Sequence, residues 1–276
     1  MKFLKQRKKI YIILLLVAGL LIACDMRLKT VFYTIDSEKV TKPVRLALIT
    51  DLHSDKYGKN QSTLLQAVEA QKPDVVLLGG DIFDDAKAYT NAEIALKQLA
   101  EKYPCYYVTG NHEYWSHDVG AILDYVKSCG ITVLSGECVP VEINGQMINI
   151  CGVDDPDVEE FMLEYDSFEE QLKTVNEAAS NEYFTVLLSH RPELVNTYEL
   201  YDFDLVLSGH AHGGQWRIPC LVNGLYVPNQ GLFPKYAGGR YDFDDWTLII
   251  SRGLARESTP IPRIFNRPEL VIVDIK

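Results

Sequence analysis

The sequence predicts a single α/β domain that follows a short apolar segment at the amino terminus. Seven short runs rich in Val, Leu and Ile have the length of buried strands, and Gly, Ser, Asp or His closes each of them. Helical patterns with recognisable ends lie between these runs. Residues 30–276 contain no internal repeat, Pro-rich linker or low-complexity tract. One domain therefore accounts for most of the 276 residues, which suffice for a buried core.

The amino-terminal segment, residues 1–24, has the pattern of a membrane signal. It contains five cations and no acid, and its fifteen apolar residues run from Ile10 to Cys24, just before Asp25. This run is short for a spanning helix, which needs about 20 residues, and suits the core of a secretory signal. Leu21-Ile22-Ala23-Cys24 also resembles a lipoprotein signal, in which Cys24 is lipidated. Both an uncleaved anchor and a lipoprotein place the remainder of the chain at the membrane, on its extracytoplasmic side.

The charge of the remaining chain excludes one class of partner. Five of the 27 Lys and Arg residues lie in residues 1–24, which leaves 22 against 38 acids, a net charge of −16. A hydrophobic content of 47% is that of a globular protein. Because general nucleic-acid binders need a basic surface, we expect no nucleic-acid partner.

The elements of the domain follow from Val44 onward, after a connecting segment at 25–43. The expected strands are 44–50, 74–80, 106–110, 131–135, 147–152, 184–190 and 204–210. Thr90 and Ser167 each precede a Glu at capping-box spacing, which predicts two helix starts. A third helix has an apolar face from Val119 to Val126 and Gly130 as its stop. From about Gly213 helical periodicity disappears, and segments 224–227, 246–251 and 270–275 predict a mostly β second half that completes the domain at 44–276.

Polar side chains with metal-binding chemistry follow five of the strands. Loops at the carboxyl ends of strands in α/β sheets converge on one crevice, so we expect these side chains to meet. Five of the six histidines belong to this set, and only His117 does not. The residues at the strand ends are Asp51 and His53, Asp81 and Asp84, Asn111, His112 and Glu113, His190, and His210 and His212.

These residue types favour a pair of transition-metal ions. Imidazoles with carboxylates suit Zn, Fe or Mn, whereas an all-oxygen set would indicate Mg or Ca. A bridging Asp between two separate His and Asp sets is what two metals about 3.5–4 Å apart require. The glycines beside Asp81, Asn111 and His210 permit tight turns and a close approach of the backbone to a metal or phosphate.

The ordered set DLH…GDIFD…GNHE…SH…GHAH resembles the calcineurin-like metallophosphoesterase superfamily over residues 44–215. YTIDSEKV, GVDDP, GHAHGGQWRIP and SRGL…PIPRIFNRPEL are similar to its membrane-tethered bacterial branch, which includes phosphodiesterases related to UDP-2,3-diacylglucosamine pyrophosphatases. The resemblance implies a four-layer fold, with two mixed β-sheets packed face to face and flanked by helices.

The resemblance also implies a role for each residue. It assigns Asp51, His53 and His212 to one metal and Asn111, His190 and His210 to the other, with Asp81 bridging them. His112 would be catalytic, stabilising the attacked phosphate and protonating the leaving oxygen. Asp84 and Glu113 would orient ligand histidines. A metal-bridged hydroxide would attack the phosphorus.

Three functions remain open. The first is a membrane-tethered phosphodiesterase or pyrophosphatase that acts on a lipid-linked or cell-envelope phosphoester. The second is a phosphomonoesterase with the same metal centre, and the third is a non-catalytic binding module of this fold. Mn, Fe and Zn are not distinguished, nor is the oligomeric state.

Several residues outside the motifs have two interpretations. Arg191 either reaches a phosphate or forms a surface ion pair, and Tyr114, Trp115 and His117 either line the pocket or pack. The arginines of the last 37 residues either meet an anionic headgroup or lie on a solvated face; they are Arg240, Arg252, Arg256, Arg263 and Arg267. The cysteines are expected to be buried hydrophobes, with a Cys129–Cys138 bridge as the alternative.

Overall fold

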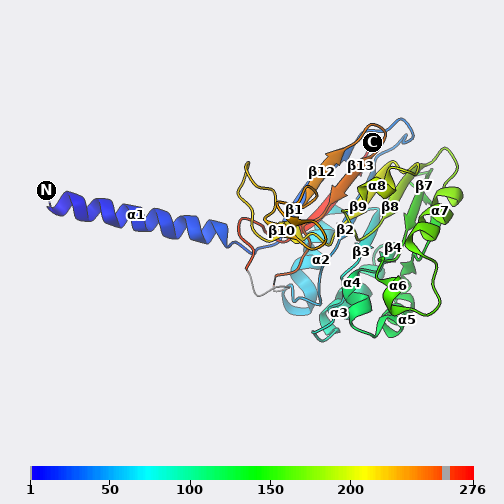
Figure 1. Cartoon of the computed structure of the whole chain (residues 1–276), viewed down its shortest axis with the longest axis horizontal. Helices are drawn as coiled ribbons and strands as arrows, with labels where there is room; N and C mark the ends of the chain where they lie inside the picture. Colours follow the sequence, from blue (N-terminus) through cyan, green and yellow to red (C-terminus); the bar gives the residue numbers. More distant parts are fainter. Residues whose placement is uncertain (1, 257–261) are drawn as a thin grey trace.

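Two six-stranded sheets lie face to face and carry helices on their outer sides in the computed structural model, which describes residues 2–256 and 262–276. The long helix α1 (Lys2–Ala23) projects away from these layers (Figure 1). The expected α/β fold with two mixed sheets flanked by helices is confirmed. Pro260 and Ile261, the first two residues of the PIPRIFNRPEL motif, lie outside the described residues.

The first sheet has the strand order β1-β14-β2-β3-β4-β5. Strands β2 to β5 are parallel to one another, whereas β14 runs antiparallel to β2. Strand β1 lies within the expected connecting segment 25–43 and pairs in parallel with β14, so part of that segment belongs to the sheet. The bounds are β1 (Lys29–Ile35), β2 (Val44–Ile49), β3 (Val75–Gly79), β4 (Cys105–Val108), β5 (Thr132–Val133) and β14 (Glu269–Ile275).

The second sheet has the strand order β12-β13-β9-β8-β7-β6. Its four inner strands β13, β9, β8 and β7 are parallel, and antiparallel strands close both edges. A small hairpin, β10 (Tyr226–Val227) with β11 (Gly231–Leu232), stands apart. The expected mostly β second half is therefore confirmed. The sheet strands are β6 (Glu137–Ile143), β7 (Gln146–Gly152), β8 (Phe184–Leu188), β9 (Leu205–Ser208), β12 (Gly239–Asp242) and β13 (Thr247–Ile250).

The core is divided by the alternation of side chains along each strand. In β2, Leu46 and Leu48 face the second sheet, whereas Ala47 and Ile49 face the helices on the outer side. Successive side chains of a strand point to opposite faces, so a strand that is apolar on both faces is buried on both. This explains why the sequence shows continuous apolar runs rather than alternating ones.

Short helices cover the two outer faces and follow the strands. Ser167 accepts a hydrogen bond from the Glu170 backbone and completes the expected capping box. The capping box at Thr90 is wrong, because Thr90 is the first helical residue and no side chain caps that helix. Gly130 has φ +80° just past its helix, as expected. The helices are α2 (Ser62–Gln71), α3 (Thr90–Ala100), α4 (Asn111–Trp115), α5 (Val119–Ser128), α6 (Val158–Phe161), α7 (Phe168–Ala178) and α8 (Val195–Tyr198).

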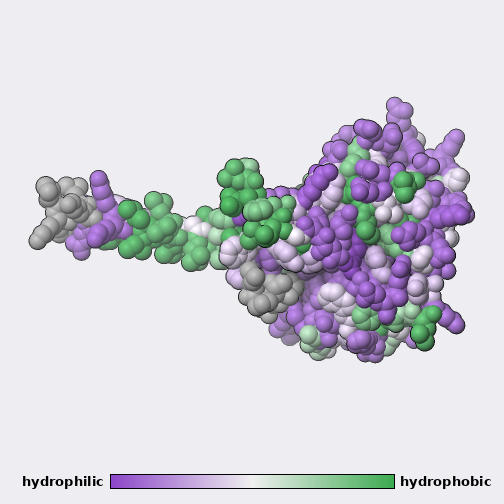
Figure 2. Space-filling view, in the orientation of Figure 1, coloured by the Kyte–Doolittle hydropathy of each residue, from purple (hydrophilic) through white to green (hydrophobic). Residues whose placement is uncertain are grey.

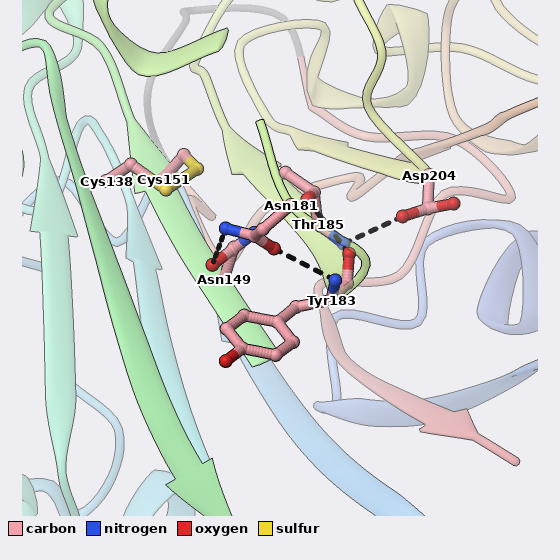
Figure 3. Close-up of a disulfide and its surroundings, with 7 residues drawn as sticks. All are labelled: Cys138, Asn149, Cys151, Asn181, Tyr183, Thr185 and Asp204. Carbon is pink, nitrogen blue, oxygen red and sulfur yellow. Dashed lines mark hydrogen bonds between the residues drawn. A yellow bond between two sulfur atoms is a disulfide. The ribbon is translucent and has the colours of Figure 1, made fainter. Parts of the chain in front are cut away.

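A disulfide joins Cys138 of β6 to Cys151 of β7 (Figure 3). The two residues are direct partners in the antiparallel ladder, which brings their side chains to the same face. The alternative bridge between Cys129 and Cys138 is wrong, because Cys129 lies at the end of α5 with a free thiol. Cys105 is a buried free cysteine, as expected for a small apolar side chain, whereas the expectation is wrong for Cys220, which is exposed.

The apolar run at the amino terminus is helical and largely exposed. Its large side chains from Ile10 to Ile22 are 49–72% exposed along α1. Among the described residues, none of the helices combines the length and the apolarity that a membrane crossing requires. The attachment of residues 1–24 to a membrane stays a prediction.

Candidate metal centre

The carboxyl ends of the parallel strands of both sheets meet at one edge of the molecule. Asp51 follows β2 and Asp81 follows β3 in the first sheet, while His190 and His210 follow β8 and β9 in the second. The backbone N–H of His210 donates to Asp51 Oδ1 at 2.9 Å, and His190 Nδ1 lies 2.8 Å from the Gly79 carbonyl oxygen. These contacts cross from one sheet to the other and fix the two halves of the site together.

The first group of potential ligands consists of Asp51, His53, Asp81 and His212. One ligand atom of each lies within 4.8 Å of the others. His212 Nε2 is 3.4 Å from Asp51 Oδ1, and His53 Nε2 is 3.6 Å from Asp81 Oδ2. Two imidazoles and two carboxylates at this spacing can hold a divalent transition metal.

The second group shares Asp81 with the first and adds His190 and His210. His190 Nε2 lies 3.0 Å from Asp81 Oδ2. Asn111 begins α4 beside Asp81 and is 1% exposed. Six of the seven residues expected to bind metal therefore lie in two groups that have Asp81 in common, and the seventh, Asn111, follows Gly110, which packs against the Asp81 carboxylate.

Unpaired polar atoms test whether these residues fit metal ions. Asp51 Oδ2 and Asn111 Oδ1 are buried and have no hydrogen-bond partner within residues 2–256 and 262–276. A buried polar atom without a partner costs about 1–3 kcal/mol, and such groups in a native structure require a ligand or another explanation. Both oxygens are lone-pair donors, one on an expected ligand of each metal, so the donor set fits a metal pair.

The backbone carries strain at the same residues. Asp51, His53, Asp81, His210 and His212 all have positive φ, between 47° and 63°. Residues other than glycine adopt this left-handed region rarely, at a cost of about 1–3 kcal/mol each where the conformation is strained. The left-handed conformation of these five residues therefore lowers the stability of the fold while it directs their side chains toward one site.

Two glycines leave the room that the carboxylates occupy. A Cβ at Gly209 would lie 2.6 Å from Asp51 Oδ2, and a Cβ at Gly110 would overlap Asp81 Oδ1. From the sequence we expected these glycines to allow a close approach of the backbone to a metal or phosphate. The structure places ligand carboxylates of the protein itself against both of them.

Burial and charge perturb the ionisable groups of the site. Burial raises the pKa of Asp51. Burial opposes the ionisation of Asp81 too, but the charges of His190 and His112 outweigh it and hold the pKa of Asp81 well below its usual range. Burial also lowers the pKa of His190, yet the Asp81 carboxylate outweighs this and raises that pKa to about 10. His212 has a pKa well below its usual range because burial is reinforced by the charges of His53 and Arg263.

His112 lies at the rim of the site, where it remains accessible. Its side chain is 21% exposed, and its ring centroid is 4.3 Å from that of His53. Its Nδ1 lies 2.6 Å from Asp85 Oδ1, and its backbone N–H donates to Asp81 Oδ1 at 2.9 Å. Asp85 is a partner that the motif reasoning missed, although it directly follows Asp84 in the sequence.

The two carboxylates expected to orient histidines differ in what they do. Asp84 Oδ2 lies 3.1 Å from His53 Nδ1, which agrees with the expectation. For Glu113 the expectation is wrong. Its carboxylate instead accepts hydrogen bonds from the backbone N–H groups of Asp81, Ile82, Phe83 and Gly110 and from the Tyr107 hydroxyl. Glu113 therefore shapes the backbone turn that carries Asp81.

Arg191 is buried, so the expectation of a surface ion pair is wrong. It is 5% exposed, and its guanidinium donates to both oxygens of Asp155, at 2.6 and 2.7 Å, and to Asp157 at 2.8 Å. Its Nη1 lies 3.5 Å from His210 Nε2. Asp155 was missed as a partner, and its only sequence signal is the GVDDP motif that follows β7.

The aromatic residues after GNHE divide between the site and the core. Trp115 is exposed, lies 4.8 Å from the His112 ring and donates to Asp157 Oδ2 at 2.7 Å. Tyr114 packs in a small buried cluster with Val119 and Val158. His117 lies against Phe161, away from the histidines of the site. Of the three, only Trp115 borders the candidate site.

The arginines near the carboxyl terminus are mostly held by the protein. Arg263 is 1% exposed and its Nη2 lies 3.3 Å from His212 Nδ1. Arg252 pairs with the buried Glu269 at 3.0 Å, and the Arg256 guanidinium lies 4.0 Å from the Tyr57 ring centre. A solvated face is therefore wrong for Arg263 and Arg252, whereas Arg240 is exposed and pairs with Asp242.

Comparison with known proteins identifies relatives of this arrangement. Residues 44–214 match the family model described as calcineurin-like phosphoesterase. An uncharacterized metallophosphoesterase of Aquifex aeolicus is 31% identical over 88% of this chain and 90% of its own. A bovine transmembrane protein with a metallophosphoesterase domain is 30% identical over 82% of this chain and 52% of its own. The NAD nucleotidase of Haemophilus influenzae has a similar fold, with a TM-score of 0.52 and 16% identity over 81% of this chain and 54% of its own.

Proposed function

The chain belongs to the calcineurin-like phosphoesterase family, and from this premise we propose that it is a membrane-attached phosphodiesterase or pyrophosphatase with two divalent metal ions. The observation that carries the proposal is the pair of ligand groups that share Asp81. Asp51, His53 and His212 would hold one ion, and Asn111, His190 and His210 the other. Two ions bound there would supply Lewis acidity and a water molecule nucleophilic near neutral pH.

The residues of the chain itself would position the substrate and move a proton. His112 is accessible at the rim, and its Nδ1 faces Asp85. A carboxylate beside Nδ1 accepts a hydrogen bond from that nitrogen and fixes the ring, so Nε2 can face the leaving oxygen and give it a proton. Asp84 would hold the His53 ring in a fixed orientation, and Glu113 would hold the Asp81 backbone.

A membrane location is supported by the amino-terminal segment. Residues 1–24 combine five cations with an exposed apolar helix, and exposed apolar surface of this extent is typical of a membrane or partner contact. The bovine relative is named as a transmembrane protein. Lipidation of Cys24 and retention of the helix as an anchor are two routes to the same location. A lipid-linked or cell-envelope phosphoester is the substrate class that this location favours.

An extracytoplasmic position of the domain is supported by the Cys138–Cys151 disulfide. Disulfides form and persist in oxidising compartments and are rare in the cytosol. The exposed free thiol of Cys220 offers a test in intact cells. We expect a membrane-impermeant maleimide to label Cys24→Ser, which retains Cys220 as its exposed thiol, and not the double variant Cys24→Ser, Cys220→Ser. Labelling only after lysis would place the domain in the cytoplasm.

The activity is tested with the full chain loaded separately with Mn, Fe or Zn. We expect hydrolysis of a phosphodiester or pyrophosphate panel to exceed that of monoesters. Preference for monoesters would support the phosphomonoesterase instead. Protein that holds two metals per chain and hydrolyses none of the esters would support a non-catalytic binding module.

A further inference from the structure

A group of large apolar side chains lies exposed on the loops between β9 and β12. The apolar loop face consists of Trp216, Ile218, Leu221, Tyr226, Leu232 and Phe233, whose exposed fractions range from 43% for Trp216 to 82% for Leu221. Figure 2 shows these loops as a hydrophobic surface beside the end of α1. An apolar hollow of about 180 Å³ opens there, against Phe265. Soluble proteins rarely expose a contiguous apolar surface without a partner.

The charge around this face differs from that of the rest of the domain. Residues 205–241, the whole stretch between Asp204 and Asp242, contain no Asp or Glu, in a chain that has 38 of them. Arg217, Lys235 and Arg240 are its cations. The exposed Leu163 shows the contrast, because it lies between Glu160 and Glu164. An apolar face with basic and no acidic residues matches an anionic lipid surface.

The apolar loop face is joined to the end of the amino-terminal helix. The Phe265 backbone N–H donates to the Ala23 carbonyl at 2.6 Å. Arg267 Nε donates to the Arg27 carbonyl at 2.9 Å, just beyond the helix. Trp216 in turn donates from its indole to Pro262 and pairs with Ile264. The segment 262–267 thus connects the exit of α1 to the apolar loops.

The same loops are fixed to the candidate metal centre. Trp216 follows His212 by four residues, and Asn266 Nδ2 donates to the His212 carbonyl at 2.7 Å. Gly214 packs on Gly224 so closely that a Cβ on either would overlap the other. The apolar loop face is therefore joined directly to the segment that carries His212.

We propose that the apolar loop face inserts into the headgroup region of an anionic bilayer and holds the metal centre at the level of lipid-linked phosphoesters. The proposal rests on the proposed membrane attachment and goes beyond it, since α1 alone would leave the domain free to turn. With both contacts made, the orientation of the site toward the bilayer is fixed. Trp216 and Tyr226 are residue types that favour the membrane interface.

Tryptophan fluorescence of the full chain tests the proposal. One protein retains only Trp216 (Trp115→Phe, Trp246→Phe), and its matched control retains only Trp246 (Trp115→Phe, Trp216→Phe). Trp246 lies at the amino end of β13, whereas the potential metal ligands follow the carboxyl ends of the parallel strands. Both are bound to phosphatidylcholine–phosphatidylglycerol vesicles with brominated acyl chains. We expect quenching and a blue shift for Trp216 and neither for Trp246.

The introduction of negative charge into the apolar loop face provides the second measurement. In the protein that retains only Trp216, Leu221→Glu with Leu232→Glu should reduce quenching to the level of the Trp246 protein. Leu200→Glu changes an equally exposed leucine, 76% exposed, on the turn after α8 and should leave quenching unchanged. Both leucines of the face are largely exposed, so circular dichroism should show an intact fold.

The possible failures are distinguishable. Protein that floats with vesicles and hydrolyses a soluble diester, but whose Trp216 is not quenched, overturns this inference alone. Quenching of Trp216 without any hydrolysis overturns the proposed activity and leaves the face intact. Unquenched Trp216 in a protein that sediments as a dimer would assign the face to a second copy of the chain.

Discussion

Glu113 holds Asp81 in place through the backbone: its Oε2 accepts the Asp81 N–H at 2.9 Å, and the same carboxylate binds three further backbone N–H groups. Asp81 is the residue shared by both potential metal sites and has φ 53°. A buried carboxylate with this many donors can keep a strained turn in a single conformation. The conformation of Asp81 thus depends on Glu113, whose carboxylate binds backbone N–H groups rather than the histidines of the site.

Replacing Glu113 by Ala should destabilise the fold by at least about 3 kcal/mol, because several buried backbone donors lose their acceptor at once. Glu113→Gln should cost less, since one oxygen remains. Urea unfolding gives both values. Glu177→Ala, on the exposed side of α7, serves as the control. A change of under about 0.5 kcal/mol in Glu113→Ala would contradict the role assigned to the carboxylate.

Asp81→Ala should remove both metal ions, whereas Asp51→Ala and His190→Ala should each affect mainly one. Asp81 belongs to both ligand groups, and the other two residues belong to one each. Metal content per chain, measured by mass spectrometry, reports the difference. We expect activity of Asp81→Ala to fall by more than about a hundredfold. Two retained metals in this variant would refute the bridging assignment.

His112→Ala should retain the metals and lower kcat by roughly 10²–10⁴-fold, the usual contribution of a general acid. Asp85→Asn should cause a smaller loss, because the histidine remains but loses the carboxylate beside Nδ1. Steady-state kinetics with substrates of different leaving-group pKa measure the effect, which should be largest for poor leaving groups. His117→Ala, at an exposed position, is the matched control. Equal loss for all leaving groups would argue against proton donation.

Arg191→Ala should destabilise the protein by about 3–5 kcal/mol, because it leaves the buried Asp155 carboxylate without its partner. The exposed Arg240–Asp242 pair provides the comparison, and Arg240→Ala should change stability by less than about 1 kcal/mol. Thermal unfolding of both variants tests the contrast. Similar small losses in the two proteins would mean that burial of the Arg191 pair does not matter for stability.

Chelation of metal should lower the stability of the wild-type chain. Asp51 Oδ2 and Asn111 Oδ1 are buried without a hydrogen-bond partner within the described ranges. An ion at a hundred times its Kd would stabilise the folded state by about 2.7 kcal/mol. Calorimetry with EDTA and after addition of Mn, Fe or Zn measures the shift. Identical melting in chelator and metal would count against a binding site at these atoms.

Much of the site could be predicted because its signal is local. Each potential ligand directly follows a strand whose apolar run is visible in the sequence, and parallel strands bring their carboxyl ends to one edge. Asp84 also lies within a recognisable motif. Glu113, Asp85 and Asp155 were misassigned or missed because their partners are determined by where backbone segments meet, which no residue spacing records.

The sequence by itself determined the α/β class, most strands and the residues that gather at their ends, since hydrophobic period and strand-end chemistry act over a few residues. The tertiary structure alone decided that β1 joins the first sheet beside β14, that Cys138 pairs with Cys151, and that Arg191 is buried against Asp155. It also decided that the apolar loops lie beside the exit of α1. These outcomes depend on strand order and register, which are set by packing between segments far apart in the chain.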